Sequence, residues 1–236
     1  MFRYSINIIL FCIIVSIPLT INALNDQRCT PRQNFFESVK SSVSELCLQA
    51  KLENDAPNNK DFIFTYANGA GVGFTYGDGG LTAAATARNW PALINHGISM
   101  VVVYLKPCAL NLPHIHPRAS TISYVAKGTI RTGSWSENTG KFHAVTLTAG
   151  QGTTFPPGAL HFEQNIGCDE AIVVAAFNSE DPGTAQLTEG IKALPLDILA
   201  ASFGNIPQNQ ILQLRNNFPK TPARGVQSCY KACGLS

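Results

Sequence analysis

Short apolar runs alternate with turn residues over the central part of the chain, from Ile98 to Asn178. The runs are SMVVVYL, STISYVA, GTIRTGSW, FHAVTLT, TTF, LHFEQN and AIVVAAFN, and Pro, Gly or Asn separates each from the next. Short strands at this spacing, with turn signals between them, are typical of a β-sandwich or a closed β-barrel. The centre of the chain is therefore predicted to be all-β.

Segments with a helical pattern flank this region. From Arg32 to Ala50, apolar side chains recur at helical intervals, which predicts one short amphipathic helix. Two further short helices are predicted in ALPLDILAASFG and PQNQILQLRNNF, and these should end near Gly204 and Pro219. The stretch 67–90 is rich in Gly and Ala, which predicts loops and edge structure.

The first residues of the chain follow the sequence pattern of a secretory signal peptide. Arg3 precedes an apolar run from Ile8 to Leu19, and the small residue Ala23 follows. An N-terminal membrane anchor is the rival interpretation, but the run is shorter than the roughly 20 residues that span a bilayer. We therefore expect an exported chain that is cleaved after Ala23 and has no membrane segment after cleavage.

Charge excludes one class of partner. The 236 residues include 17 Lys and Arg against 15 Asp and Glu, so the net charge is only +2, and no long basic run occurs. Such a chain lacks the electrostatic footprint of a polyanion-binding protein, so nucleic acid is not an expected partner. No internal repeat or linker divides the chain, which predicts one domain with extensions at both ends.

Cysteine content agrees with export. Loss of Cys12 with the signal peptide leaves six of the seven cysteines, an even number that suits disulfides in an oxidising compartment. Spacing alone does not fix their connectivity. A zinc site at Cys229 and Cys233 is disfavoured because no second pair matches it. The expected pairs are Cys29 with Cys47, Cys108 with Cys168, and Cys229 with Cys233.

Two of the five histidines, His114 and His116, stand two apart in LNLPHIHPRAST. On an extended strand this spacing places both rings on one face, about 6.5 to 7 Å apart at the backbone. Both rings would then reach a single ion. Taken alone, the segment is equally compatible with two surface histidines in a Pro-rich turn.

A second segment, GQGTTFPPGALHFEQN at 150–165, adds His161 in a fixed pattern with Gly150, Pro156, Gly158 and Asn165. Together with PHIHPRAS, this pattern resembles the two sequence motifs of the germin branch of the cupin superfamily. The flanking segment FNSEDPGTAQL is similar too, and the overall likeness is nearest to the spherulin 1 group of slime-mould germin relatives, which are associated with encystment.

The resemblance implies a single jelly-roll β-barrel that holds a divalent metal ion between His114, His116 and His161. Manganese is the family's usual metal, whereas imidazole ligands alone would suit zinc, iron or copper equally. The predicted organisation is a signal peptide at 1–23, an N-terminal helical extension at 24–60, a cupin β-barrel at 61–182 and a C-terminal helical extension at 183–236.

One ligand position departs from the germin pattern. Germins place a metal-binding Glu five residues after the second histidine, where this chain has Thr121. Three neutral histidines leave the charge of a divalent ion uncompensated, which disfavours redox catalysis. Glu163 shares a strand face with His161 and is an alternative fourth ligand. The other interpretation is that Glu163 hydrogen-bonds a ligating histidine or faces the barrel mouth.

A second departure concerns substrate. Germin oxalate oxidases use two asparagines near the metal; Asn111 matches one of them, and Val101 stands where the other would be. Oxalate oxidation is therefore the least favoured of the family's activities. His96 and His143 match no ligand position, and a structural or solvent-exposed role is expected for both.

Three functions remain open at this point. The favoured one is a secreted, metal-binding germin-like protein with a wall, coat or storage role, homo-oligomeric through its helical tail, with a wall or coat polymer as partner. The second is an extracellular manganese oxidoreductase, either a superoxide dismutase or, less favoured, an oxalate oxidase. The third is a carbohydrate or small-ligand module without a metal, which the retention of three histidines disfavours.

Overall fold

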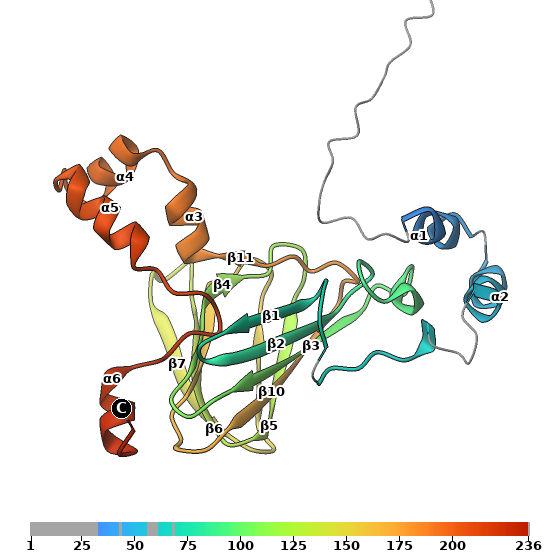
Figure 1. Ribbon diagram of the computed structural model, residues 1–236, viewed down its shortest axis with the longest axis horizontal. Helices are drawn as coiled ribbons and strands as arrows, with labels where there is room; N and C mark the ends of the chain where they lie inside the picture. The colour runs from blue at the N-terminus through green and yellow to red at the C-terminus, as the bar shows by residue number, and fades with distance from the viewer. Residues whose placement is uncertain (1–32, 43, 56–60, 68, 236) are drawn as a thin grey trace, which may run out of the picture.

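The structure is a computed structural model that describes residues 33–42, 44–55, 61–67 and 69–235 (Figure 1). Two antiparallel sheets occupy its centre. The strands of the larger sheet are β1 (Phe74–Gly77), β2 (Gly80–Ala85), β3 (Ser99–Leu105), β5 (Thr121–Lys127), β8 (Gly152–Phe155) and β10 (Ala171–Phe177). Those of the smaller sheet are β4 (Leu110–Ile115), β6 (Thr129–Trp135), β7 (Phe142–Thr148), β9 (His161–Asn165) and β11 (Ala185–Gln186).

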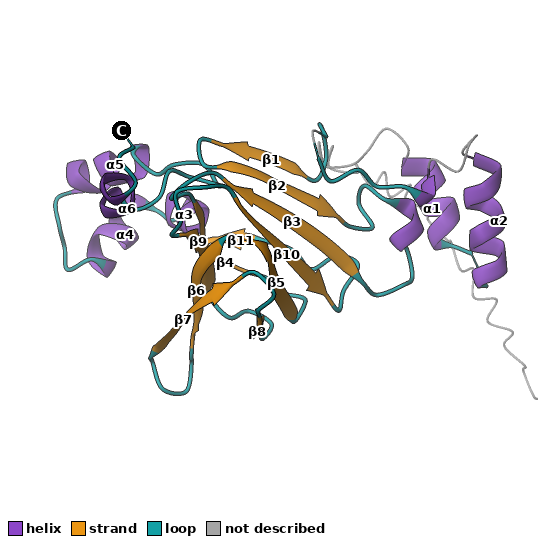
Figure 2. Cartoon of the chain, turned by 90° about the horizontal axis from the view of Figure 1, so that it is seen from below, coloured by secondary structure: helices purple, strands orange, loops and turns teal. Residues whose placement is uncertain are grey.

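The strand order is β1-β2-β3-β10-β5-β8 in the larger sheet and β11-β4-β9-β6-β7 in the smaller one. Figure 2 shows the two sheets as separate layers. Side chains on β10 alternate between buried and half-buried along its whole length, which is the two-residue period of a strand with one face on a core. The buried core between the layers contains Val103, Leu105, Val125, Ile130 and Val173. The predicted all-β cupin fold is confirmed, as two packed sheets.

Strand β2 is not an edge element, although the sequence predicted only loops and edge structure there. It pairs with both β1 and β3 and carries Ala83 and Ala85, both fully buried. Gly80 opens the strand at a φ of 138°, and a Cβ there would lie 2.0 Å from the carbonyl oxygen of Tyr104. Small residues therefore allow the strands to pack closely here. Because they are small, the segment lacks the pattern of large apolar residues that normally indicates a strand.

The described residues of the N-terminal extension form two α-helices where the sequence predicted one. They are α1 (Gln33–Lys40) and α2 (Glu45–Asp55). Ser44 precedes α2, and its hydroxyl oxygen accepts a hydrogen bond from the backbone N–H of Cys47 at 3.3 Å, as in a helix N-cap. The break lets Val39 of α1 and Leu48 of α2 pack in one cluster with Ile94.

The C-terminal extension contains four helices: α3 (Leu187–Ala193), α4 (Leu196–Ser202), α5 (Gln208–Asn216) and α6 (Gln227–Ala232). The two predicted helices correspond to α4 and α5, while α3 and α6 are too short to show a clear period. The pair α1–α2 and the group α3–α5 lie at opposite ends of the sheets (Figures 1 and 2). Within the described ranges, no helix is both long and apolar enough to cross a bilayer. The predicted signal peptide lies outside these ranges.

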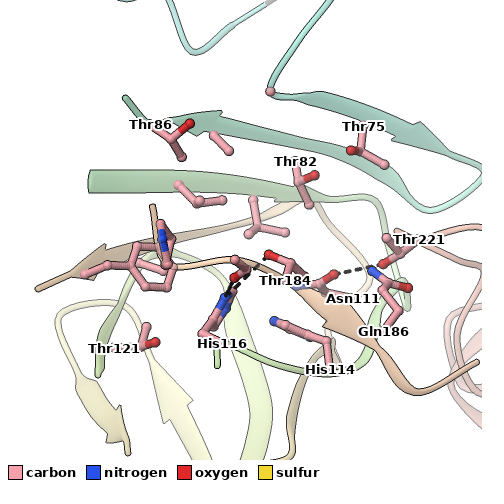
Figure 3. A pocket seen from close by; sticks show the side chains of 18 of the residues that line it. Thr75, Thr82, Thr86, Asn111, His114, His116, Thr121, Thr184, Gln186 and Thr221 are labelled. Atoms are coloured by element: carbon pink, nitrogen blue, oxygen red, sulfur yellow. Dashed lines mark hydrogen bonds between the residues drawn. The ribbon is translucent and has the colours of Figure 1, made fainter. Parts of the chain in front are cut away.

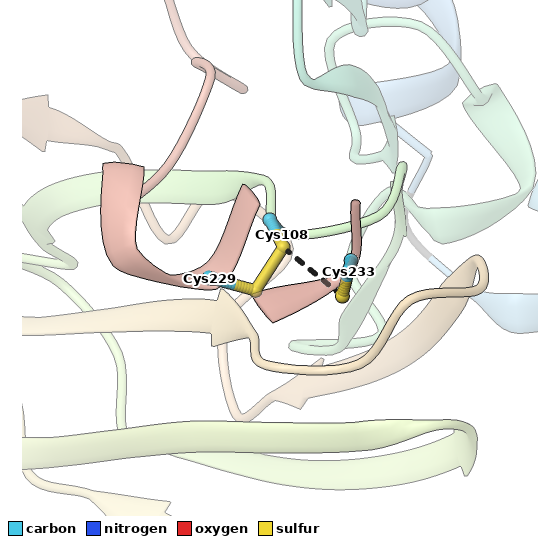
Figure 4. A group of neighbouring side chains, drawn as sticks. All are labelled: Cys108, Cys229 and Cys233. Carbon is cyan, nitrogen blue, oxygen red and sulfur yellow. Dashed lines mark hydrogen bonds between the residues drawn. A yellow bond between two sulfur atoms is a disulfide. The ribbon is translucent and has the colours of Figure 1, made fainter. Parts of the chain in front are cut away.

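Two disulfides attach helix α6 to the sheets. Cys108 bonds to Cys229, as Figure 4 shows, and Cys168 bonds to Cys233. The predicted pairs Cys108 with Cys168 and Cys229 with Cys233 are therefore wrong. Positions 229 and 233 are four residues apart on α6, so both face the sheets and reach two different loops. Cys108 lies between β3 and β4, and Cys168 lies between β9 and β10.

The remaining expected pair joins Cys29 to Cys47. Cys29 lies outside the described residues, so this pairing stays a prediction. Cys47 is exposed and is free of any disulfide to a described residue.

The segment between α5 and α6 returns to the sheets. Ala223 and Leu110 exchange two backbone hydrogen bonds, of 2.8 and 2.9 Å, and Ala223 is 1% exposed. The backbone N–H of Gly79 donates to the Pro222 carbonyl at 2.8 Å. A Cβ at position 225 would lie 1.7 Å from the Cys108 carbonyl oxygen, so Gly225 is required for this approach. The tail thereby becomes part of the wall around the interior of the domain.

The disulfide that closes the longer loop should contribute measurably to stability. Cys108 and Cys229 are 121 residues apart, so their bond restricts the unfolded chain strongly. We expect Cys108→Ala/Cys229→Ala to lower the free energy of unfolding by about 2–5 kcal/mol in urea denaturation. Lys141→Ala, at an exposed position outside every predicted or observed disulfide, is the control and should leave stability unchanged. Peptide mapping that links Cys108 to Cys168 would contradict the connectivity.

Candidate metal centre

Three histidines, His114, His116 and His161, come together in the interior, and Figure 3 shows the first two of them. His114 on β4 and His161 at the start of β9 are direct partners in the strand register. His116 follows the end of β4. Their exposed fractions are 4%, 1% and 6% for His114, His161 and His116, so the three rings are buried.

A backbone carbonyl holds each ring at its Nδ1 atom. The Nδ1···O distances are 2.7 Å from His114 to Leu112, 2.6 Å from His116 to Gly183 and 2.8 Å from His161 to Ala159. A carbonyl oxygen only accepts hydrogen bonds, so the proton of each neutral ring must sit on Nδ1. The three Nε2 atoms consequently carry free lone pairs.

These lone pairs meet in one place. One nitrogen from each ring lies within 4.8 Å of the nitrogens of the other two. The Nε2 atom of His161 is fully buried and has no hydrogen-bond partner. Such an orphaned acceptor is costly in a protein interior. A divalent transition ion would satisfy it, because imidazole nitrogen is a preferred ligand for such ions.

The protonation state also suits metal binding. Burial holds the pKa of His114 well below its usual value, and the nearby rings of His161 and His116 add to this effect. Burial lowers the pKa of His116 to about 4, although its bond to the Gly183 carbonyl acts in the opposite direction. Both rings are therefore neutral at physiological pH, which is the form that binds a metal.

Aromatic rings pack around the cluster. The ring of Phe155 stacks on His161 with a centroid separation of 4.1 Å, and Phe177 packs edge-on against His116 at 4.6 Å. These contacts limit water on two sides of the cluster and restrict the rotation of the imidazoles. Apolar walls of this kind strengthen electrostatic interactions inside the site.

Other residues of the second sequence motif have structural roles. Gly150 and Gly158 adopt left-handed backbone conformations in the turns before β8 and β9, with φ values of 90° and 73°. Asn165 is fully buried, and its side-chain amide donates to the carbonyls of Leu105, Lys106 and Asp169. It thereby ties together the two loops that carry Cys108 and Cys168.

Thr121 occupies the position of the missing carboxylate. It begins β5, is 3% exposed and lines the same cavity as His114 and His116 (Figure 3). Its hydroxyl is fully buried and has no hydrogen-bond partner. The site is thus a three-histidine arrangement with a polar but uncharged neighbour.

Glu163 lies beside this arrangement and is not one of the three grouped ligands. It pairs in register with Asn111, whose side-chain amide donates to the Glu163 carboxylate at 2.8 Å. Burial raises the pKa of Glu163, while the proximity of His161 and the bond from Asn111 lower it. The hydrogen bond to its carboxylate comes from Asn111, and ligation of an ion by Glu163 stays a prediction.

A residue from the tail completes this group. The Thr221 hydroxyl donates to the Asn111 side-chain oxygen at 2.8 Å and accepts from the Leu112 backbone N–H at 3.1 Å. The Asn111 amide is therefore engaged on both sides. Sequence reasoning missed Thr221, because nothing near it in the chain indicates that the tail returns to the site.

A cavity of about 540 Å³ leads to the histidines. Val101 and Asn111, the two positions compared with the germin asparagines, both line it. His96 and His143 do not join the cluster. His143 is exposed on β7, and His96 is exposed with its Nε2 atom 3.8 Å from a Glu45 carboxylate oxygen.

The fold and the buried histidine cluster together define a class. The family described as Cupin matches residues 70–210. The chain belongs to the cupin family.

Particular members resemble it over most of its length, and they confirm the predicted likeness to germins and spherulins. It is 40% identical to Spherulin-1A of Physarum polycephalum over 205 residues, which cover 83% of this chain and 82% of that protein. It is 38% identical to Germin-like protein 5-1 of Oryza sativa subsp. japonica over 153 residues, covering 63% and 68%. A solved structure of recombinant oxalate oxidase in complex with glycolate aligns with a TM-score of 0.62 and 26% identity, covering 70% of this chain and 84% of that one.

The lowered histidine pKa values predict the pH dependence of the metal-free protein. Unfolding returns His114 and His116 to a pKa near 6.5, so the unfolded state binds more protons below that pH. Stability should therefore fall as the pH drops from 6.5 towards 4. Glu163 has a raised pKa and acts with the opposite sign, but it is one group against two.

Urea unfolding with a chelator at pH 7 and pH 5 checks this dependence. The His114→Gln/His116→Gln variant keeps Glu163 and removes both titrating rings, so it should lose less stability between the two pH values than the parent. An equal loss in parent and variant would show that these histidines do not cause it.

Proposed function

We propose that this protein is a secreted, metal-binding member of the germin-like cupins. His114, His116 and His161 would hold one divalent transition ion through their Nε2 atoms. The observation that carries the proposal is the set of three Nδ1 to carbonyl hydrogen bonds, which directs three unprotonated nitrogens to one place. Manganese is the proposed ion because of the resemblance to germins.

The proposed biological role is structural, in a wall, a coat or a store, and associated with encystment or stress. Similarity to Spherulin-1A supports this assignment. The chemistry of the site supports it as well, because Thr121 brings no negative charge to offset a divalent ion. Such a site binds an ion but gives weak support to a higher oxidation state.

Secretion is part of the proposal. The signal-like start of the sequence and the two disulfides at helix α6 both suit an oxidising compartment outside the cell. A wall or coat polymer is the proposed macromolecular partner in that compartment.

A homo-oligomer is proposed as the assembled form. Large apolar side chains are exposed on α3 to α5 and the turns between them, where a second copy could cover them. These side chains are Leu187, Leu194, Ile198, Phe203, Leu212 and Leu214.

An oxidoreductase is the second candidate. The cavity of about 540 Å³ that reaches the histidines favours it, because a substrate could approach an ion there. When bound, manganese would supply a Lewis-acid and one-electron redox centre. Within the chain, Glu163 would have to hold or accept a proton beside His161, and Asn111 would position its carboxylate. Oxalate is disfavoured as the substrate, since Asn111 is already engaged by Thr221 and Glu163.

Metal content tests the site directly. We expect the purified secreted protein to contain close to one equivalent of manganese by elemental mass spectrometry. The His114→Ala/His161→Ala variant should retain none, because two of the three ligands are lost. His143→Ala removes an exposed histidine and is the matched control, with unchanged metal content. Full loading of the double variant would place the metal elsewhere.

The substitution Thr121→Glu tests the charge argument. The position lines a cavity, so a longer side chain has room, and a carboxylate would offset the charge of the ion. Manganese should bind roughly 10-fold to 100-fold more tightly to this variant in competition with a chelator. Thr121→Gln, which is similar in size and uncharged, should show no such gain, and equal gains in both would refute the charge argument.

Activity of the loaded parent separates the two candidates. The structural role predicts no superoxide dismutation by fully loaded protein. Activity that disappears in Glu163→Gln with the metal retained would instead establish the oxidoreductase.

A further inference from the structure

The cavity continues beyond the histidines into an outer compartment (Figure 3). One wall comes from the β1–β2 edge of the larger sheet and the turn after it. The facing wall comes from the segment before α3 and from the returning tail. Uncharged polar side chains line both walls: Thr75, Thr82 and Thr86 on the first, and Thr184, Gln186 and Thr221 on the second.

Two of these hydroxyl groups form a defined pair. Thr75 and Thr82 are directly opposite each other in the β1–β2 register, and both line the cavity. Side chains opposite each other in an antiparallel pair have Cβ atoms about 4.5–5.5 Å apart. Each hydroxyl both donates and accepts, so the pair can bind two neighbouring hydroxyl groups of a ligand.

On β3 and β10, the same face of the sheet is apolar. Thr82 is in register with Val103 on β3, and Val103 is in register with Val173 on β10. Both valines are buried in the core. The hydroxyl groups thus begin where the core ends, and they face the open part of the cavity.

One hydroxyl group at the inner end of the cavity has no hydrogen-bond partner. It belongs to Thr121, which is 3% exposed. A buried, unsatisfied hydroxyl is destabilising unless something binds it. It lines the same cavity, so a ligand that extends inward would meet a further polar contact.

Charged side chains of both signs line the compartment. Arg88 and Lys220 line it together with Asp181 and Glu189, so these four groups carry no net formal charge. They therefore present no strong field of one sign to a ligand.

We propose that the outer compartment binds a neutral polyhydroxylated ligand, namely a mono- or disaccharide unit. The facing hydroxyl and amide groups and the balanced charge fit this class of ligand. The whole cavity, including its inner end at the histidines, has a volume of about 540 Å³, which falls in the usual range for small-molecule sites. This binding goes beyond the proposed metal function and does not require the ion.

Calorimetric titration of the purified full-length secreted protein tests the proposal, with cellobiose, lactose and N-acetylglucosamine as probes. We expect at least one of them to bind. Thr75→Val/Thr82→Val removes two hydroxyls at nearly constant volume and should weaken that binding at least 10-fold. Thr146→Val, on the exposed part of β7 outside the cavity, is the matched control and should bind like the parent. Thermal unfolding of each variant verifies that it is folded.

Chelated and manganese-loaded protein should bind the saccharide equally. Saccharide binding that occurs only in loaded protein would overturn the independent outer site. Undiminished binding by the valine variant, or no binding of any of the three probes, would overturn it as well. Metal content is measured separately, so failure here is distinguishable from failure of the metal proposal.

Discussion

The hydrogen bonds between imidazole Nδ1 atoms and backbone carbonyls are the constraint on which the interior of this protein depends. Each fixes a tautomer, a ring orientation and a free Nε2 atom in one contact. The carbonyls belong to Leu112, Ala159 and Gly183, which are distant in sequence. Pairing of β4 with β9 and with β11 brings them together. The site therefore needs β4, β9 and β11 to be paired.

The C-terminal tail positions polar side chains next to the histidine cluster. Two disulfides fix α6 against loops at one end of the sheets, and the segment before it places Thr221 against Asn111. Asn111 then holds the Glu163 carboxylate beside His161. A residue far along the chain from the histidine motifs thus sets the polar surroundings of the cluster, and the tail also forms part of the wall of the cavity.

Strands such as β10 could be predicted because each is a short apolar run bounded by turn residues. Strand β2 could not, since its close approach to β3 needs Gly80 and small buried side chains that leave no apolar pattern. The histidine set could be predicted from two motifs, whereas the partner of Asn111 could not, because the return of the tail depends on long-range packing. The disulfide pairing failed for the same reason: α6 directs Cys229 and Cys233 to different loops.

Three Nε2 atoms are proposed to hold a single ion. A crystal structure of manganese-loaded protein, with anomalous scattering recorded above the manganese absorption edge, would locate that ion. We expect one strong anomalous peak per chain, within bonding distance of the Nε2 atoms of His114, His116 and His161, with each Nδ1 still bonded to its carbonyl. A peak elsewhere in the protein, or a ring turned so that Nδ1 faces the ion, would contradict it.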